Sequence, residues 1–142
     1  MIKDNEEMKR KKSFLRRYKK ALEKINKLED KIRDIDERMT GLKAVRISDD
    51  VKGGSRVSIE EMISDKMVLE ERIKRLKARA LEIKIEVCHV IDTVEDIKLS
   101  EVLELYFIDC LSFDDIAIKI NYTKRHTIGL YSKALGMIVI EQ

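Results

Sequence analysis

Four basic side chains near the C-terminus have the chemistry to bind phosphate groups: Lys119, Lys124, Arg125 and Lys133. No acidic residue lies between the first and the last of them. The surrounding residues 95–142 carry five basic and eight acidic side chains, so these four form a local basic region within an acidic one. Net charge can hide such a basic face, and a basic face is what phosphate contact requires.

The histidines and cysteines do not form a catalytic or metal-binding pattern. The two histidines are His89 and His126, and the two cysteines are Cys88 and Cys110. Cys88 adjoins His89, but successive residues on a helix point about 100° apart and make a poor nucleophile–base pair. The glycine pair at 53–54 lacks the Lys-Ser/Thr that completes a phosphate-binding loop. We therefore expect no enzyme activity, no metal site and no cofactor.

Short capped helices are expected to position the basic residues. Ser100 can cap a helix that runs through about Asp109, and Ser112 can cap a second helix over Phe113–Ile120. Thr123 is a good N-cap for a final helix that carries most of the basic side chains. The three residues between the last two helices form a turn. The C-terminal third thus predicts three short helices.

The spacing within these helices is typical of a helix-turn-helix motif. Ala117 is small enough for the two helices to cross, and Asn121, four positions later, tolerates a left-handed backbone. Tyr122 is expected to fill the turn. The expected core of the motif is Ile116, Ala117, Ile120, Tyr122 and Leu130, with a weaker contribution from Thr127. The alternative is a three-helix fold that does not bind DNA.

The C-terminal third resembles region four of bacterial sigma factors in four runs: VLELYF (102–107), LSFDDIA (111–117), NYT (121–123) and YSKAL (131–135). It is more similar still to small phage and prophage proteins that join this domain to a preceding helical hairpin, a group that includes regulators of phage late genes. Two residues depart from the pattern, since Asn121 replaces the usual turn glycine and Thr127 an aliphatic residue. The resemblance implies transcriptional regulation through double-stranded DNA, with RNA polymerase as a further partner.

The resemblance also assigns roles to individual residues. The first turn of the last helix reaches base edges, and Arg125 is the best candidate for a bidentate guanine contact. Lys119 and Lys133 occupy positions typical of phosphate contacts, and Gly129 lets the backbone approach. His126 either contacts DNA or simply faces solvent. The implied DNA-binding residues are Lys119, Thr123, Lys124, Arg125, His126 and Lys133.

Two long heptad patterns precede this region and predict an antiparallel helical hairpin of the coiled-coil type. The first runs from Phe14 to Leu42 and the second from Ile59 to Ile97, interrupted only at Lys66. Ser58 with Glu61 forms a capping box that is expected to begin the second helix. The apolar positions of the two patterns are Phe14, Tyr18, Ala21, Ile25, Leu28, Ile32, Ile35, Met39 and Leu42, and Ile59, Met62, Leu69, Ile73, Leu76, Ala80, Ile83, Val87, Val90, Val94 and Ile97.

The predicted fold class is therefore all-α, with a hairpin over residues 1–98, a loop at about 45–58, and a helix-turn-helix domain over 99–142. Charged residues make up 40% of the chain and aromatic residues 5%, and proline is absent, which favours long helices over a loop-rich fold. Extra apolar residues beside the heptads favour a homo-oligomer formed through the hairpin. No apolar run is long enough to span a membrane, no signal peptide is visible, and we expect a cytoplasmic protein with reduced cysteines.

Two other functions remain open from the sequence. A coiled-coil adaptor could bind RNA polymerase or another phage protein without reading DNA, since acidic residues would suit a basic protein surface. A subunit of a phage DNA-packaging machine also combines a helix-turn-helix with helical oligomerisation. The basic cluster at residues 9–20 is either a solvated helix start or a supplementary phosphate contact. The acidic residues in question are Glu101, Glu104, Asp109, Asp114 and Asp115.

Overall fold

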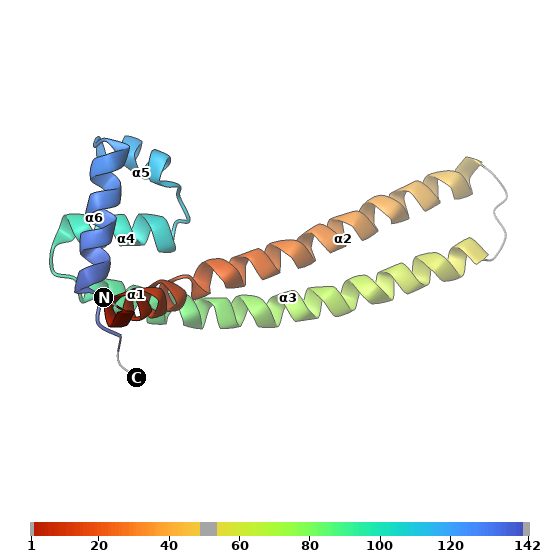
Figure 1. Ribbon diagram of the computed structural model, residues 1–142. Coiled ribbons are helices and arrows are strands. Elements are labelled where there is room, and N and C mark those ends of the chain that lie inside the picture. The colour runs from red at the N-terminus through yellow and green to blue at the C-terminus, as the bar shows by residue number, and fades with distance from the viewer. Residues whose placement is uncertain (1, 49–53, 141–142) are drawn as a thin grey trace. The chain divides into compact units, whose positions relative to one another are not determined.

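The computed structural model describes residues 2–48 and 54–140, and all regular secondary structure in these residues is α-helical (Figure 1). This confirms the predicted fold class, a helical hairpin with a small helical domain. Contacts divide the chain into two compact units: unit 1 is Met1–Ala21 with Ala80–Gln142, and unit 2 is Leu22–Arg79. The helices are α1 (Ile2–Leu15), α2 (Arg17–Ser48), α3 (Gly54–Asp92), α4 (Ile97–Phe107), α5 (Phe113–Ile120) and α6 (Lys124–Met137).

Unit 2 is the part of the hairpin in which α2 and α3 lie side by side and antiparallel (Figure 1). Two ion pairs between the helices fix this direction, because the partner on α3 moves back along the chain as the residue on α2 moves forward. Lys77 Nζ lies 3.8 Å from Glu29 Oε1, and Lys66 Nζ lies 2.7 Å from Asp36 Oδ1. Where the structure describes burial in unit 2, the buried residues all belong to the predicted heptads: Ile25, Leu28, Ile59 and Ile73.

Lys66 explains how the interrupted heptad is accommodated. Its side chain is about one-third exposed, and its ammonium group pairs with Asp36 of the facing helix and, at 4.0 Å, with Glu70 of its own helix. The hydrogen bond with Asp36 is the main cause that raises the pKa of Lys66 above its usual value, although burial acts in the opposite direction. A cation is therefore tolerated in the apolar stripe because two carboxylates balance its charge.

Unit 1 has a single core to which α1, the end of α3 and the three C-terminal helices all contribute. Its fully buried side chains include Leu15 of α1, Val87 and Ile91 of α3, Phe107 of α4 and Leu135 of α6. The C-terminal helices therefore share their core with the base of the hairpin. This division differs from the predicted boundary between residues 98 and 99, because a heptad change marks where a helix pattern ends and not where a core ends.

All seven aromatic side chains of the protein belong to unit 1, and four of them form a cluster. The ring of Tyr106 stacks on Phe113 with a centroid distance of 4.6 Å and lies 4.9 Å from both Phe107 and Tyr131. Burial raises the pKa of Tyr131 to about 12, and the neighbouring Tyr106 adds to this effect while Arg16 opposes it. This cluster joins α4, α5 and α6 at one end of the core.

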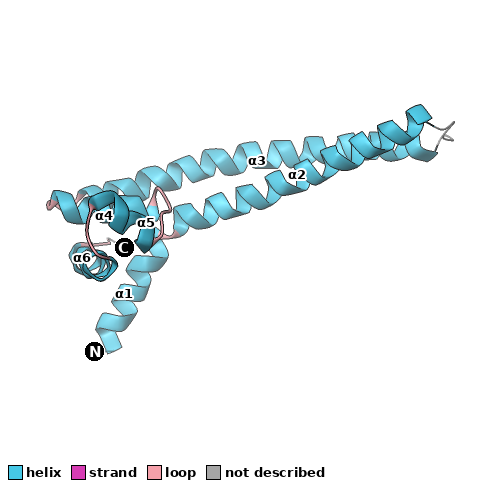
Figure 2. Ribbon diagram, turned by 90° about the horizontal axis from the view of Figure 1, so that it is seen from above, coloured by secondary structure: helices cyan, strands magenta, loops and turns pink. Residues whose placement is uncertain are grey.

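The helix boundaries differ from the expected ones at three places. The first helical stretch is interrupted at Arg16, where α1 and the first turns of α2 run in different directions (Figure 2). The second long helix already begins at Gly54, so Ser58 lies within it. Of the predicted loop at about 45–58, residues 45–48 and 54–58 are helical and 49–53 lie outside the described residues.

The third boundary concerns the start of α4. Asp96 is its N-cap and accepts hydrogen bonds from the N–H groups of Lys98 and Leu99, at 3.0 and 3.2 Å. Ser100 lies inside the helix, where its hydroxyl donates to the carbonyl of Ile97. Aspartate and serine cap helices about equally well, so local preference alone does not decide between them. The earlier start places Leu99, which is 2% exposed, on the inner face of the helix.

Within the described residues, no helix is both long and apolar enough to cross a bilayer.

Candidate nucleic-acid interface

The turn between α5 and α6 has the backbone geometry expected from the sequence. Ser112 caps α5 and accepts a hydrogen bond from the Asp115 N–H at 3.2 Å. Asn121 ends α5 in a left-handed conformation with φ of 62°, and its N–H donates to carbonyls of the last turn. Thr123 caps α6 and accepts a hydrogen bond from the His126 N–H at 3.1 Å. The orientation of the first turn of α6 is thus fixed by two N-caps and one left-handed residue.

Most of the expected core of the motif is placed inside. Ile116, Ala117 and Ile120 are buried, and Leu130 is half-buried against the core. Thr127 is fully buried, and its hydroxyl donates to the carbonyl of Thr123 at 2.9 Å. Because this hydrogen bond satisfies the hydroxyl, the methyl group can pack inside without leaving a buried polar atom unpaired. Threonine is therefore a good substitute for an aliphatic residue here.

Tyr122 does not fill the turn as expected. Its side chain is 41% exposed, and its ring stacks on His126 with a centroid distance of 4.6 Å and an interplanar angle of 26°. Lys98 Nζ lies 5.2 Å from the centre of the same ring. Because a tyrosine ring is amphipathic, contacts with an imidazole and an ammonium group hold it at the surface. Tyr122 is therefore part of the surface that carries the candidate DNA-binding residues.

All six candidate DNA-binding residues are exposed: Lys119, Thr123, Lys124, Arg125, His126 and Lys133. No carboxylate of the described residues pairs with Arg125. Thr123 uses its oxygen as an acceptor for the cap, so its hydroxyl hydrogen can still be donated to a phosphate. His126 is held by its stack on Tyr122 and does not extend freely into solvent.

One expectation about this surface was wrong. Lys124 has no acidic neighbour in the sequence, but Asp114 of α5 lies across the turn, with Oδ1 3.4 Å from Lys124 Nζ. Both side chains are more than half exposed, so the pair is screened by water and is weak. Residues 119–133 therefore contain no acidic residue in sequence, but in the folded protein one of their cations, Lys124, has a carboxylate partner from α5.

The remaining features of α6 leave room for a partner. A methyl group added at Gly129 would meet nothing within 4 Å, so the helix surface is low at this point. Gly136, near the end of the helix, is equally open. Arg125 and Lys133 therefore project from a helix face on which no other described side chain lies against Gly129.

A buried lysine that the sequence did not reveal fixes the other end of α6. Lys11 of α1 is 7% exposed, and its Nζ donates to the carbonyl of Leu135 at 3.2 Å and to that of Gly136 at 3.5 Å. Glu7, one turn earlier on α1, lies 3.7 Å away and supplies the balancing charge. A cation at the negative end of a helix dipole is favourable, and the final carbonyls of a helix need donors. The N-terminal helix therefore anchors the candidate recognition helix.

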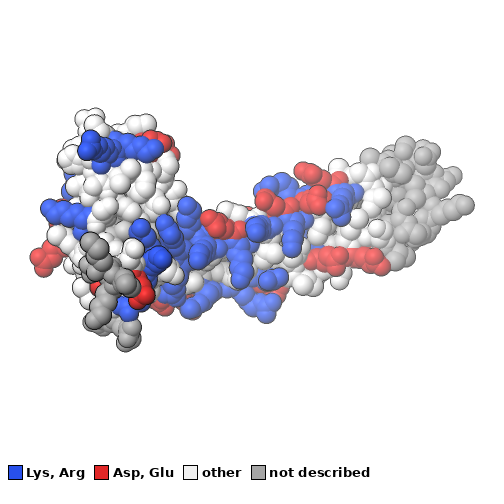
Figure 3. All heavy atoms as spheres, in the orientation of Figure 1, with Lys and Arg blue, Asp and Glu red and all other residues white. Residues whose placement is uncertain are grey.

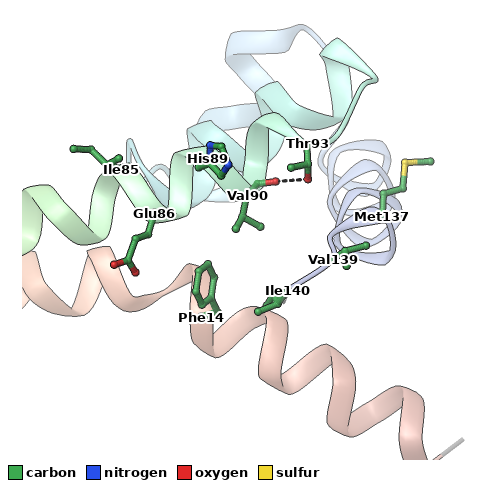
Figure 4. Close-up of a pocket in the computed structure, with 9 residues that line it drawn as sticks. All are labelled: Phe14, Ile85, Glu86, His89, Val90, Thr93, Met137, Val139 and Ile140. Atoms are coloured by element: carbon green, nitrogen blue, oxygen red, sulfur yellow. Dashed lines mark hydrogen bonds between the residues drawn. The ribbon is translucent and has the colours of Figure 1, made fainter. Parts of the chain in front are cut away.

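A hollow of about 610 Å³ in unit 1 is lined mainly by apolar side chains of α1, α3, the end of α6 and the C-terminal segment (Figure 4). Its polar groups are mostly engaged within the protein. Glu86 pairs with Arg17 at 2.8 Å, and the Thr93 hydroxyl donates to the carbonyl of Val90 at 2.6 Å. His89 also lines the hollow. The lining residues are Phe14, Ile85, Glu86, His89, Val90, Thr93, Met137, Val139 and Ile140.

The thiol of Cys88, next to His89, has a raised pKa. Burial raises the pKa of Cys88 above its ordinary value, and the carboxylates of Glu104 and Asp92 add to this effect. A raised pKa keeps the thiol protonated near neutral pH and lowers its nucleophilicity. Among the described residues, no group of three or more His, Cys, Asp or Glu side chains could hold a metal ion.

The fold and the exposed turn define an all-helical protein with a hairpin and a small C-terminal domain that presents a partly basic helix. The chain belongs to the family described as "Protein of unknown function (DUF1492)", whose model matches residues 41–135. The match covers α3, α4, α5 and most of α6, and it leaves out α1 with its anchoring Lys11. No curated protein and no solved structure matches the chain significantly.

Proposed function

We propose that this protein is a DNA-binding transcriptional regulator of phage or prophage origin that acts in the cytoplasm and reads double-stranded DNA with the start of α6. The observation that carries the proposal is the turn itself. A left-handed Asn121 between two capped helices presents Lys124 and Arg125 in the first turn of an exposed helix. Helix-turn-helix proteins place side chains of this turn against base edges in the major groove.

The exposed side chains suit different parts of this task. A guanidinium group matches the two acceptors of guanine in the major groove, so Arg125 is assigned to base recognition. Lys119 and Lys133 are assigned to phosphates, which position the protein without selecting a sequence. Lys11 supports this function indirectly, because its hydrogen bond to the Leu135 carbonyl anchors the C-terminal end of the recognition helix.

The test compares two substitutions on the same helix. On the preferred duplex, Arg125→Ala should weaken binding by about 1–3 kcal/mol and relax selectivity at one base pair. Lys133→Ala should weaken binding to all sequences alike and reduce the slope of log affinity against log salt by about one. Fluorescence anisotropy titrations at several salt concentrations measure both quantities. Equal effects of the two substitutions on preferred and scrambled duplexes would contradict the assignment of Arg125.

Exposed carboxylates on α4, on α5 and on the segment between them favour a second candidate function, a coiled-coil adaptor that binds RNA polymerase or another phage protein. Glu104, Asp109 and Asp115 are all exposed and would suit a basic protein surface. Such an adaptor would bind DNA only weakly and would lose it at physiological salt. The duplex titrations above therefore separate the two candidates.

Self-association through the hairpin is the remaining part of the proposal. Unit 2 exposes three large apolar side chains on α3, Ile63, Met67 and Val68, at 45, 64 and 66%. A second copy of the hairpin could cover them, as a two-helix unit becomes a four-helix one. Analytical ultracentrifugation should show a dimer that Met67→Glu with Val68→Glu dissociates. A monomer at micromolar concentration would contradict self-association and would leave the DNA-binding proposal in place.

A further inference from the structure

A hollow of about 390 Å³ brings the start of the hairpin beside the start of α6. Lys19 of α2 lines it together with Lys124, although 104 residues lie between them in the chain. Ser112 and Asp114 at the start of α5 also line it, together with Tyr106, Cys110, Leu111 and Phe113. All of these residues belong to unit 1.

One of the two lysines that line this hollow, Lys124, already has a carboxylate beside it, whereas the other, Lys19, has none among the described residues. Asp114 Oδ1 lies 3.4 Å from Lys124 Nζ, so a carboxylate occupies one side of this ammonium group. Lys19 is exposed, and no carboxylate of the described residues pairs with it. Arg16 and Lys20 are exposed on the same stretch of chain. Figure 3 shows basic side chains gathered over the region where α1 ends and α2 begins.

We propose that Lys19 and Lys124 bind one backbone phosphate of DNA across this hollow, and that the phosphate displaces the Asp114 carboxylate from Lys124. This inference rests on the proposed function and extends it to the hairpin. A phosphodiester has two free oxygens that can each accept a hydrogen bond from an ammonium group. The exposed pair between Lys124 and Asp114 is weak enough to exchange its anion.

Two consequences follow for recognition. The hairpin base contributes directly to DNA binding, so the C-terminal helices alone do not make up the complete surface. Asp114 competes with this one phosphate for Lys124 whatever the DNA sequence, and therefore lowers affinity for all DNA, while the base contacts of Arg125 still favour the preferred sequence. Asp114 thus limits non-specific binding by the basic start of α6.

The first experiment compares Lys19→Gln with Lys20→Gln, which removes the same charge from the next residue, a residue that does not line the hollow. In anisotropy titrations with the full-length protein and its preferred duplex, Lys19→Gln should weaken binding about two- to fivefold and Lys20→Gln by less than about twofold. Lys19→Gln combined with Lys124→Gln should lose less than the product of the two single effects, because both residues bind one phosphate. Lys19→Gln combined with Lys133→Gln should lose the full product.

The second experiment compares Asp114→Asn with Asp115→Asn, since both remove one negative charge from the first turn of α5. Asp114→Asn should tighten binding to a scrambled duplex about two- to fivefold, and Asp115→Asn by less than about twofold. Equal effects within each matched pair, or a full product for Lys19 with Lys124, would overturn the shared phosphate site. If the unsubstituted protein bound no duplex at all, the proposed function itself would fail, so the two failures are distinct. Circular dichroism of each variant checks that its helices are intact.

Discussion

The two units of this protein are stabilised in different ways. Unit 2 buries a narrow stripe of aliphatic side chains between two helices and supplements it with exposed ion pairs. Unit 1 buries side chains from five helices around one core and contains every aromatic ring of the chain. A residue in unit 1 therefore has neighbours on several elements, whereas a residue in unit 2 has one facing helix. The candidate recognition helix, α6, therefore belongs to the unit with the more extensive core.

The largest expected difference between the units comes from truncating the core of unit 1. Phe107 is 1% exposed and its ring contacts those of Tyr106 and Tyr131, so Phe107→Ala should lower the free energy of unfolding by about 3–5 kcal/mol. Urea titration followed by tyrosine fluorescence measures this effect, because all four tyrosines belong to unit 1. Leu76→Ala in unit 2 should cost clearly less, since Leu76 is only half-buried. Hydrogen exchange measures the stability of each unit separately. If it showed equal losses of stability for Phe107→Ala and Leu76→Ala, the contrast between the units would be removed.

The next effect in size concerns the anchor of α6. Lys11→Met keeps the aliphatic stem but leaves the carbonyls of Leu135 and Gly136 without this donor, and should destabilise unit 1 by about 1–3 kcal/mol. Lys9→Met is the matched control, because Lys9 is exposed on the same helix. Thermal unfolding followed by near-ultraviolet circular dichroism reports on unit 1 alone. An equal change for both variants would show that the buried ammonium group does not stabilise the end of α6.

A smaller effect is expected from titration of Tyr131, whose pKa is raised to about 12 from its ordinary value of 10 by burial and by Tyr106. The fold favours the neutral phenol, so this contribution to stability is complete below pH 10 and is lost as the pH rises from 10 towards 12. Unfolding by urea at pH 8 to 11 should show a loss of about 1 kcal/mol that Tyr131→Phe abolishes.

The smallest expected effect tests whether the interruption of the apolar stripe at Lys66 limits the stability of unit 2. Lys66→Leu replaces the one cation in the stripe by an apolar side chain and should raise the Tm of unit 2 by about 2–4 °C. Lys66→Ala is the control, because it removes the ion pair with Asp36 and fills no space. Hydrogen exchange in the peptides of α2 and α3 measures the change locally. Stability that falls for Lys66→Leu as much as for Lys66→Ala would show that the ion pair matters more than the interruption.

Local features of the fold were predictable because they depend on neighbouring residues. The heptads gave the helical hairpin, and the caps at Ser112 and Thr123 with the left-handed Asn121 gave the turn. Where two capping residues compete, as Asp96 and Ser100 do, the choice depends on which residues the core takes up, and the sequence alone does not show this. The break at Arg16 lies inside an unbroken heptad pattern, and no local signal marks it.

The parts of the candidate site that were missed all depend on contacts between distant segments. Lys11 reaches carbonyls more than 120 residues away, and Asp114 reaches Lys124 across the turn. Tyr122 was expected inside because it is aromatic, whereas its partners His126 and Lys98 hold it at the surface. A charge count along the chain cannot detect such pairs, since they are created only when the helices pack.

Selection of bound fragments from random double-stranded DNA by the purified full-length protein tests the central claim most directly. We expect an enriched sequence whose selectivity at one base pair is lost when the selection is repeated with Arg125→Ala, because Arg125 lies in the first turn of α6 and pairs with no carboxylate of the described residues. Recovery of no enriched sequence, together with unchanged binding by the Arg125→Ala and Lys133→Ala variants, would contradict the claim that this helix reads DNA.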